Sequence, residues 1–92
     1  MKTYRIDGTR IGSKADFFTE IGRAVNGDGG YFGSNLDALA DCLRGGFGTP
    51  EDRLFRFVMT DYRDIKEALG DDTWGTVLTI FTTEGVDLWL EN

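Results

Sequence analysis

The chain has 92 residues and a formal net charge of −6, which is enough length for one small domain spanning residues 1–92 and not for two. Its acidic surface is expected to repel nucleic acid and anionic membranes and to attract basic proteins. The absence of His and the single Cys exclude an ordinary zinc site and the usual general base near neutral pH. A carboxylate site for a hard cation remains open.

A lone Cys cannot form an internal disulfide, which suits a reducing compartment. The N-terminal residues Met1–Arg5 lack an apolar signal segment, and no apolar run approaches the length of a membrane span. We therefore expect a cytoplasmic protein.

The first third of the chain predicts a strand followed by a helix. Alternation over Tyr4–Ile6 indicates a short strand that ends in a turn at residues 7–8. Ser13 and Asp16 have the spacing of a capping box, and Gly27 is a plausible helix stop. The apolar residues of this helix recur at helical spacing and are Phe17, Phe18, Ile21 and Val25.

A glycine-rich segment runs from Gly27 to Gly33. It fails the dinucleotide-binding fingerprint, because Phe32 stands where a third glycine is needed, and no Lys follows it as in a Walker loop. It also fails as a calcium loop, because Tyr31 occupies the position of the sharp glycine turn. We expect the glycines to let the backbone bend and to bring Tyr31 beside the following helix.

The next segment predicts a short amphipathic helix capped by Ser34 or Asn35. Its apolar stripe consists of Leu36, Leu39, Ala40 and Leu43. A second stripe, about 100° around the helix, consists of Asp37, Asp41 and Arg44. Gly45–Pro50 then breaks the helix. Cys42 has no basic neighbour to act as its catalytic base, so we interpret it as a small, partly buried hydrophobe.

The second half begins with a nearly continuous apolar run, Leu54–Met59, which predicts a buried strand. Thr60 or Asp61 is placed to cap a helix that ends at Gly70. The apolar residues of that helix are Tyr62, Ile65 and Leu69.

Another helix is predicted to start at Asp71, although its Val, Ile and Thr residues favour strands. Its apolar side carries Trp74, Val77, Leu78 and Phe81. The alternating segment Val86–Leu90 predicts a last strand. Strands separated by helices pair in parallel. We therefore expect an α/β fold, with a three-stranded, largely parallel sheet and about four helices packed on it.

Asp37 and Asp41 lie four residues apart and project from the same side of their helix, where two like charges repel each other. Either they face a positive partner or they form a solvated face. An acid–base pair would need one raised pKa, and a polar face beside Arg44 gives no reason to expect that. Core packing is favoured for both Trp residues, whereas exposure and burial stay equally open for Tyr31 and Phe47.

The segment from Tyr31 to Gly45 resembles the barstar family of intracellular inhibitors of secreted guanyl-specific ribonucleases. The resemblance is strongest at Gly33, over residues 35–39 and over residues 41–43, and it extends more weakly over the whole chain. It implies that Trp74–Thr83 is a helix. It also implies a non-enzymatic protein without cofactor or metal, which binds one ribonuclease molecule and neither nucleic acid nor membrane.

In that family the acidic helix and its preceding loop plug the ribonuclease active site. The position of Asp41 lies where the substrate phosphate would lie, and that of Asp37 makes hydrogen bonds at the recognition site. The expected partner-binding residues are Tyr31, Gly33, Asn35, Leu36, Asp37, Ala40, Asp41, Arg44, Gly45, Gly46 and Phe47.

The chain departs from the family pattern at several of these positions. Ala40 replaces an aromatic residue, Arg44 replaces an uncharged one, and Ser34 replaces an acid. An acidic contact on the last helix has no clear counterpart near Trp74. These changes suggest a different cognate enzyme, with Phe47 and Gly46 supplying lost contact area. Two alternatives stay open: an immunity protein against another toxin with a basic cleft, as in toxin–antitoxin pairs, and a reused fold with a regulatory role.

Overall fold

Three strands form one parallel sheet in the computed structural model, which describes residues 1–92. β1 (Lys2–Asp7) and β3 (Asp87–Leu90) are the edges, and β2 (Phe55–Thr60) lies between them. The register pairs Tyr4 of β1 with Phe57 of β2. The parallel sheet confirms the predicted α/β fold.

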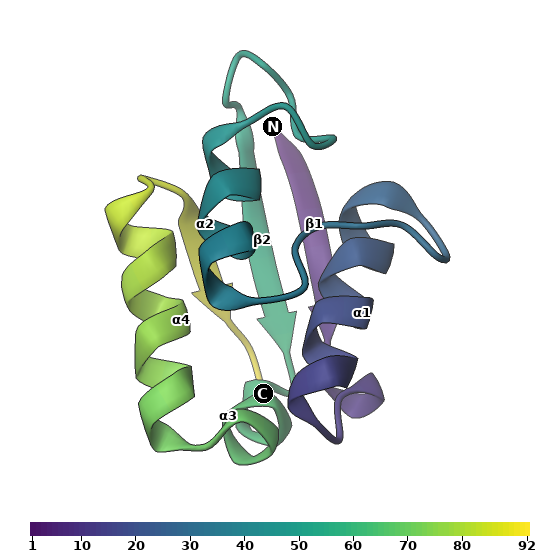
Figure 1. Cartoon of the computed structure of the whole chain (residues 1–92), viewed down its shortest axis with the longest axis vertical. Helices are drawn as coiled ribbons and strands as arrows, with labels where there is room; N and C mark the ends of the chain where they lie inside the picture. Colours follow the sequence, from purple (N-terminus) through teal and green to yellow (C-terminus); the bar gives the residue numbers. More distant parts are fainter.

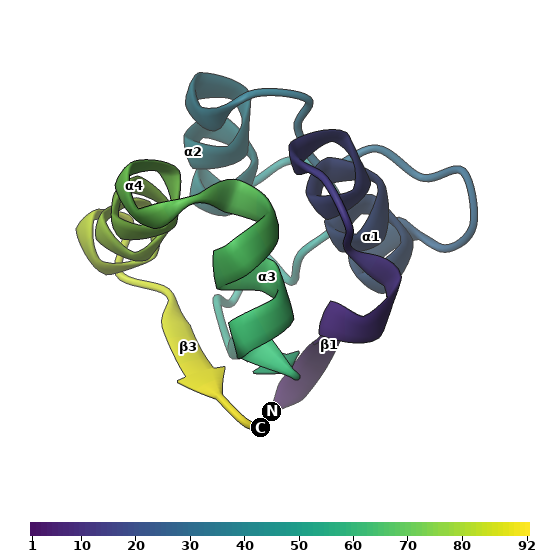
Figure 2. The ribbon, with the colours of Figure 1, turned by 90° about the horizontal axis from the view of Figure 1, so that it is seen from below.

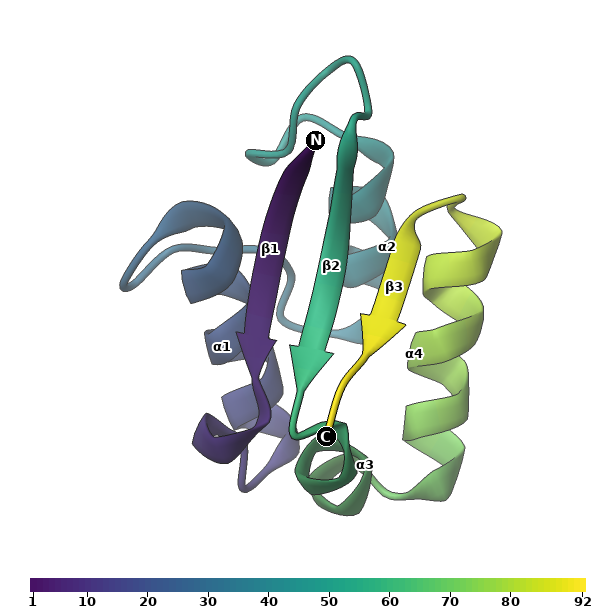
Figure 3. The same ribbon diagram turned by 180° about the vertical axis from the view of Figure 1, so that it is seen from behind.

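Four helices cover one face of this sheet (Figure 1, Figure 2). They are α1 (Lys14–Asn26), α2 (Leu36–Arg44), α3 (Tyr62–Leu69) and α4 (Asp71–Thr83). A short 3-10 helix, η1 (Gly8–Arg10), follows β1. α2 lies between α1 and α4 in front of β2, and Figure 3 shows that no helix covers the opposite face of the sheet. None of the helices combines the length and the apolar character that a membrane span requires.

Side-chain caps fix where α1 and α2 begin. The N–H of Asp16 donates to Ser13 Oγ at 3.1 Å, as predicted. The Asp16 carboxylate accepts from the N–H of Gly12 at 3.0 Å, so the return bond of the capping box is displaced by one residue. The N–H of Ala38 donates to Asn35 Oδ1 at 2.8 Å, which makes Asn35 the cap of α2.

One predicted helix cap lacks its side-chain bond, and one predicted strand boundary is wrong. Asp61 stands at the N-cap of α3 with a left-handed φ of 48° and no side-chain cap bond, and Thr60 Oγ1 donates to the Ile6 carbonyl instead. Asp61, one of the two predicted alternatives, is therefore the N-cap residue by position, but its side chain makes no capping bond, and Thr60 is the last residue of β2. Leu54 was expected inside that strand, but β2 begins at Phe55 and Leu54 is 57% exposed. The N–H of Leu54 is bonded to Asp52 in the preceding turn.

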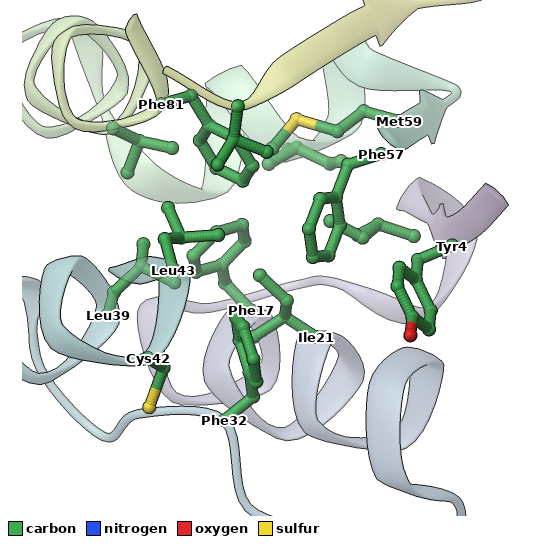
Figure 4. Close-up of a cluster of buried hydrophobic side chains, with 14 of the residues drawn as sticks. Tyr4, Phe17, Ile21, Phe32, Leu39, Cys42, Leu43, Phe57, Met59 and Phe81 are labelled. Atoms are coloured by element: carbon green, nitrogen blue, oxygen red, sulfur yellow. The ribbon is translucent and has the colours of Figure 1, made fainter. Parts of the chain in front are cut away.

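The core lies between the sheet and the helices, and aromatic rings fill much of it (Figure 4). The Phe57 ring is central and packs against four others, those of Tyr4, Phe32, Phe55 and Phe81. Helix α2 contributes Leu39, Cys42 and Leu43 to this cluster. The helix that carries the acidic stripe is therefore anchored by its other side.

The two Trp residues have different environments. Trp74 is 7% exposed and its ring stacks on Tyr62, which confirms core packing. Trp89 is 53% exposed, so core packing was the wrong prediction for it. Strand alternation turns Trp89 away from Leu88, toward the face that no helix covers. There the Arg56 guanidinium carbon lies 4.7 Å from the centre of the Trp89 ring.

One carboxylate is buried beside the end of β1. Glu20 of α1 is 3% exposed, accepts two hydrogen bonds of 2.6 Å from Arg23, and accepts one of 2.7 Å from the Asp7 N–H. Burial by itself would raise the pKa of Glu20, but these hydrogen bonds outweigh burial and hold the pKa below its usual value. The Glu20–Arg23 ion pair lies within α1, and the hydrogen bond from the Asp7 N–H to Glu20 ties α1 to the end of β1.

Candidate functional site

Helix α2 divides its residues cleanly between core and surface. Leu39, Cys42 and Leu43 are buried, whereas Leu36 and Ala40 are only half-buried. The buried face of α2 therefore includes Cys42, which the predicted apolar stripe left out, and it includes less of Leu36 and Ala40 than predicted. Burial and the nearby Asp41 raise the pKa of the Cys42 thiol. The opposite side carries Asp37, Asp41 and Arg44, all exposed as predicted.

The loop before α2 is held down by one buried ring and one glycine. Phe32 is fully buried among the core rings, so its neighbour Tyr31 points outward and is 51% exposed. Gly33 is itself buried, with a φ of +95°. A Cβ at Gly33 would lie 2.9 Å from the backbone nitrogen of Leu39. The absence of a side chain at Gly33 therefore allows the loop to pack closely against α2.

We expect Gly33→Ala to destabilise the protein by about 2 kcal/mol, through backbone strain at positive φ and crowding against α2. Urea unfolding followed by circular dichroism measures this loss. Gly27→Ala is the matched control, because Gly27 also has positive φ but a Cβ there meets nothing within 4 Å. An equal loss in both variants would show that close approach to α2 is not the cause.

The two loops that flank α2 are joined to each other. The Nδ2 group of Asn26, the last residue of α1, donates to the carbonyls of Tyr31 and Phe47, both at 2.8 Å. The centroids of the Tyr31 and Phe47 rings lie 6.3 Å apart, and Phe47 is 45% exposed. The structure thus resolves the question of exposure or burial in favour of a shared, exposed aromatic patch. Nothing in the local sequence around Asn26 indicated this role.

Arg44 connects the acidic stripe of α2 to α4. Its Nη1 donates to Asp41 Oδ1 at 2.7 Å. Its Nε and Nη2 donate to the two carboxylate oxygens of Glu84 at 2.9 and 3.0 Å. The hydrogen bonds that Arg44 donates to the Glu84 carboxylate raise the pKa of Arg44. Asp41 therefore has an intramolecular partner, whereas Asp37 forms no ion pair.

Arg53 fixes the ends of α2 and α4 relative to each other. Its guanidinium donates to the carbonyls of Leu43 and Arg44 at the end of α2, at 3.2 and 2.8 Å. It also donates to the carbonyl of Glu84 at 3.0 Å. A cation at the C-terminal ends of two helices donates hydrogen bonds to their free carbonyls and interacts favourably with the negative ends of both helix dipoles.

We expect Arg53→Ala to lower the free energy of unfolding by about 1–2 kcal/mol, since three carbonyls lose a charged donor. Arg53→Lys keeps the charge but not the planar fork, so it should recover only part of the loss. Chemical denaturation of the three proteins checks both values. Full recovery by Lys would mean that charge alone is responsible.

A shallow hollow of about 430 Å³ lies beside the start of α2. Its lining residues are Lys14, Phe18, Ser34, Asn35, Leu36 and Asp37. Asp37 thus lines the same hollow as Phe18 and Lys14 of α1. No three Asp, Glu, Cys or His side chains come together as ligands for a metal ion.

These features define a small protein of barstar-like α/β fold, with four helices on one face of a three-stranded parallel sheet. The family model for Barstar (barnase inhibitor) matches residues 1–91, and the chain belongs to that family. A comparison with curated proteins gives no significant match. The family inhibits barnase-type ribonucleases, and the partner contacts of the individual residues remain predictions.

Proposed function

We propose that this protein is a cytoplasmic inhibitor of a small secreted guanyl-specific ribonuclease, with no catalytic activity of its own and one binding domain over residues 1–92. The observation that carries the proposal is the Asp41 carboxylate of this barstar-family chain. It stands on an anchored helix with 63% of its side chain exposed, and one of its oxygens is held by Arg44.

The mechanism follows from charge. A ribonuclease cleft is cationic because it binds phosphate, and a fixed carboxylate placed there mimics that group without being cleavable. Asp41 fills the phosphate position with its free oxygen. Asp37, one turn earlier on the same side of α2, sets the register of docking. The net charge of −6 speeds encounter with a basic enzyme.

The surroundings of Asp41 supply contact area around this central charge. The neighbouring rings of Tyr31 and Phe47 come from the two loops that flank α2, and the exposed parts of Leu36 and Ala40 lie along the helix. Gly45 and Gly46 allow the partner to approach the end of α2 closely. Asn35 and Gly33 keep the loop in place. A 1:1 interface of standard size, about 1,600 Å², accommodates this set.

The test is a titration of the protein against a panel of secreted guanyl-specific ribonucleases, both basic and acidic, with RNA cleavage as the readout. We expect stoichiometric inhibition of at least one enzyme, and loss of that inhibition in Asp41→Ala. Inhibition of no member would contradict the proposal and shift the assignment to a toxin outside the ribonuclease superfamily. If neutralising both Asp37 and Asp41 leaves the cellular effect of the protein unchanged, a regulatory reuse of the fold is favoured.

A further inference from the structure

The Arg44 guanidinium stands in the middle of the proposed interface with unused hydrogen-bonding capacity. A guanidinium has five N–H donors. Three of them are directed at Glu84 and Asp41, which leaves one N–H on Nη1 and one on Nη2. These two N–H groups have no acceptor within the chain, and the side chain as a whole is 61% exposed.

Arg44 is also held in one place. Arg44 donates two hydrogen bonds to the carboxylate of Glu84, and the Glu84 side chain is only 12% exposed. Arg53 ties the backbone of Arg44 to that of Glu84. A bidentate pair on a fixed backbone presents its remaining donors in a fixed direction. The Arg44 charge can therefore leave a docking partner only if its hydrogen bonds to Glu84 and Asp41 break.

We propose that Arg44 determines which ribonuclease is inhibited, with Glu84 as its positioning residue. This inference rests on the proposed function. The cognate enzyme must offer two neighbouring groups: a cation for the free oxygen of Asp41, and a carboxylate that accepts the two open N–H groups of Arg44. If the phosphate pocket of an enzyme contains only cations, the charge of Arg44 repels them, and binding of that enzyme is disfavoured.

The physical reason is the price of burying an unpaired charge. A guanidinium that loses water without gaining an acceptor is strongly unfavourable, and like charges across an interface repel. Arg44 thus adds a repulsive element against one class of enzyme and an attractive one toward another, which is how specificity is built. Asp41 supplies attraction to both classes.

The experiment compares the wild-type protein with Arg44→Ala, Arg44→Lys and Glu84→Gln against an inhibited enzyme from the panel. We expect Arg44→Ala to weaken binding at least tenfold. Arg44→Lys should weaken it nearly as much, because an ammonium group cannot hold Glu84 and Asp41 and still offer a planar pair of donors. Glu84→Gln should weaken it several-fold, and the double variant Arg44→Ala/Glu84→Gln should bind no worse than Arg44→Ala alone.

The same variants are titrated against panel enzymes that the wild-type protein inhibits poorly and whose phosphate pockets carry no acid. There Arg44→Ala should bind more tightly than wild type, because the repelled charge is gone. Urea unfolding of each variant excludes a folding defect as the cause. If the wild-type protein inhibits an enzyme and all variants bind it within twofold, the inference is wrong and the proposed function stands. If the wild-type protein inhibits no panel enzyme, both are overturned.

Discussion

Replacement of Asp41 by Ala is expected to weaken binding to the cognate ribonuclease by about 3 kcal/mol or more, over 100-fold. The reason is its central position: the carboxylate enters the cationic phosphate pocket, and its loss leaves enzyme cations buried without a partner. Asp37→Ala removes a more peripheral carboxylate, at the rim of the hollow near Lys14, and should cost far less. Isothermal titration of each variant with the enzyme measures both effects.

Asp87→Ala is the matched control for this comparison. Asp87 is exposed on β3 and lies in the sheet, away from α2, so the variant loses one negative charge without losing a contact. It should change only the association rate, and only at low salt. Equal effects below 1 kcal/mol for Asp37→Ala and Asp41→Ala, within error of Asp87→Ala, would refute the assignment of roles.

The second large effect is expected at Glu20, in folding rather than binding. Glu20→Ala leaves the Asp7 N–H and the Arg23 guanidinium without their acceptor, next to the core. The Arg23 side chain is 32% exposed and water can rehydrate it in part, so we expect a loss of about 2 kcal/mol, below that for a fully buried pair. Denaturant unfolding at pH 7 measures the loss. Glu67→Gln, at an exposed carboxylate of α3, should be neutral.

Glu20 also gives stability a specific pH dependence. The pKa of Glu20 is lower in the folded chain than its usual value of 4.5, so the folded state binds fewer protons than the unfolded state. The stabilisation is therefore complete above about pH 4.5 and is lost as pH falls through the lower folded pKa. Unfolding curves from pH 7 to pH 3 should fall steeply for the wild-type protein and less steeply for Glu20→Gln. Parallel curves would contradict this linkage.

The order of the strands and helices could be predicted from the sequence because each element is indicated by residues close together in the chain. Helical spacing of apolar residues, caps such as Ser13 and stops such as Gly27 act within a few positions of one another. Trp89 was misplaced because alternation assigns a residue to one of two sheet faces, and only the whole fold shows which face is covered. Leu54 was misassigned at the start of β2, where a turn competes with the strand, and the left-handed backbone of Asp61 leaves the predicted cap position without a side-chain bond.

The site was predictable to the same degree. The exposed side of α2 followed from spacing, and the resemblance of this segment to a known family supplied the roles that we propose for its residues. The supporting contacts did not follow, because they join distant residues. Asn26 reaches Phe47 across 21 positions and Arg44 reaches Glu84 across 40. No local pattern specifies such bonds, since they depend on how α1, α2 and α4 pack on the sheet.

The bare face of the sheet makes the protein a convenient optical reporter. Trp89 lies on that face in water, whereas Trp74 is enclosed beside Tyr62. Acrylamide should quench the emission of Trp89 selectively, and the remaining blue-shifted emission of Trp74 should follow unfolding. Because Trp89 stands on the side of the sheet opposite α2 and Trp74 lies in the interior, a ribonuclease docked on α2 leaves both fluorophores in their own surroundings. Intrinsic fluorescence can therefore measure the stability of variants even within the bound complex, wherever the partner's own emission can be subtracted.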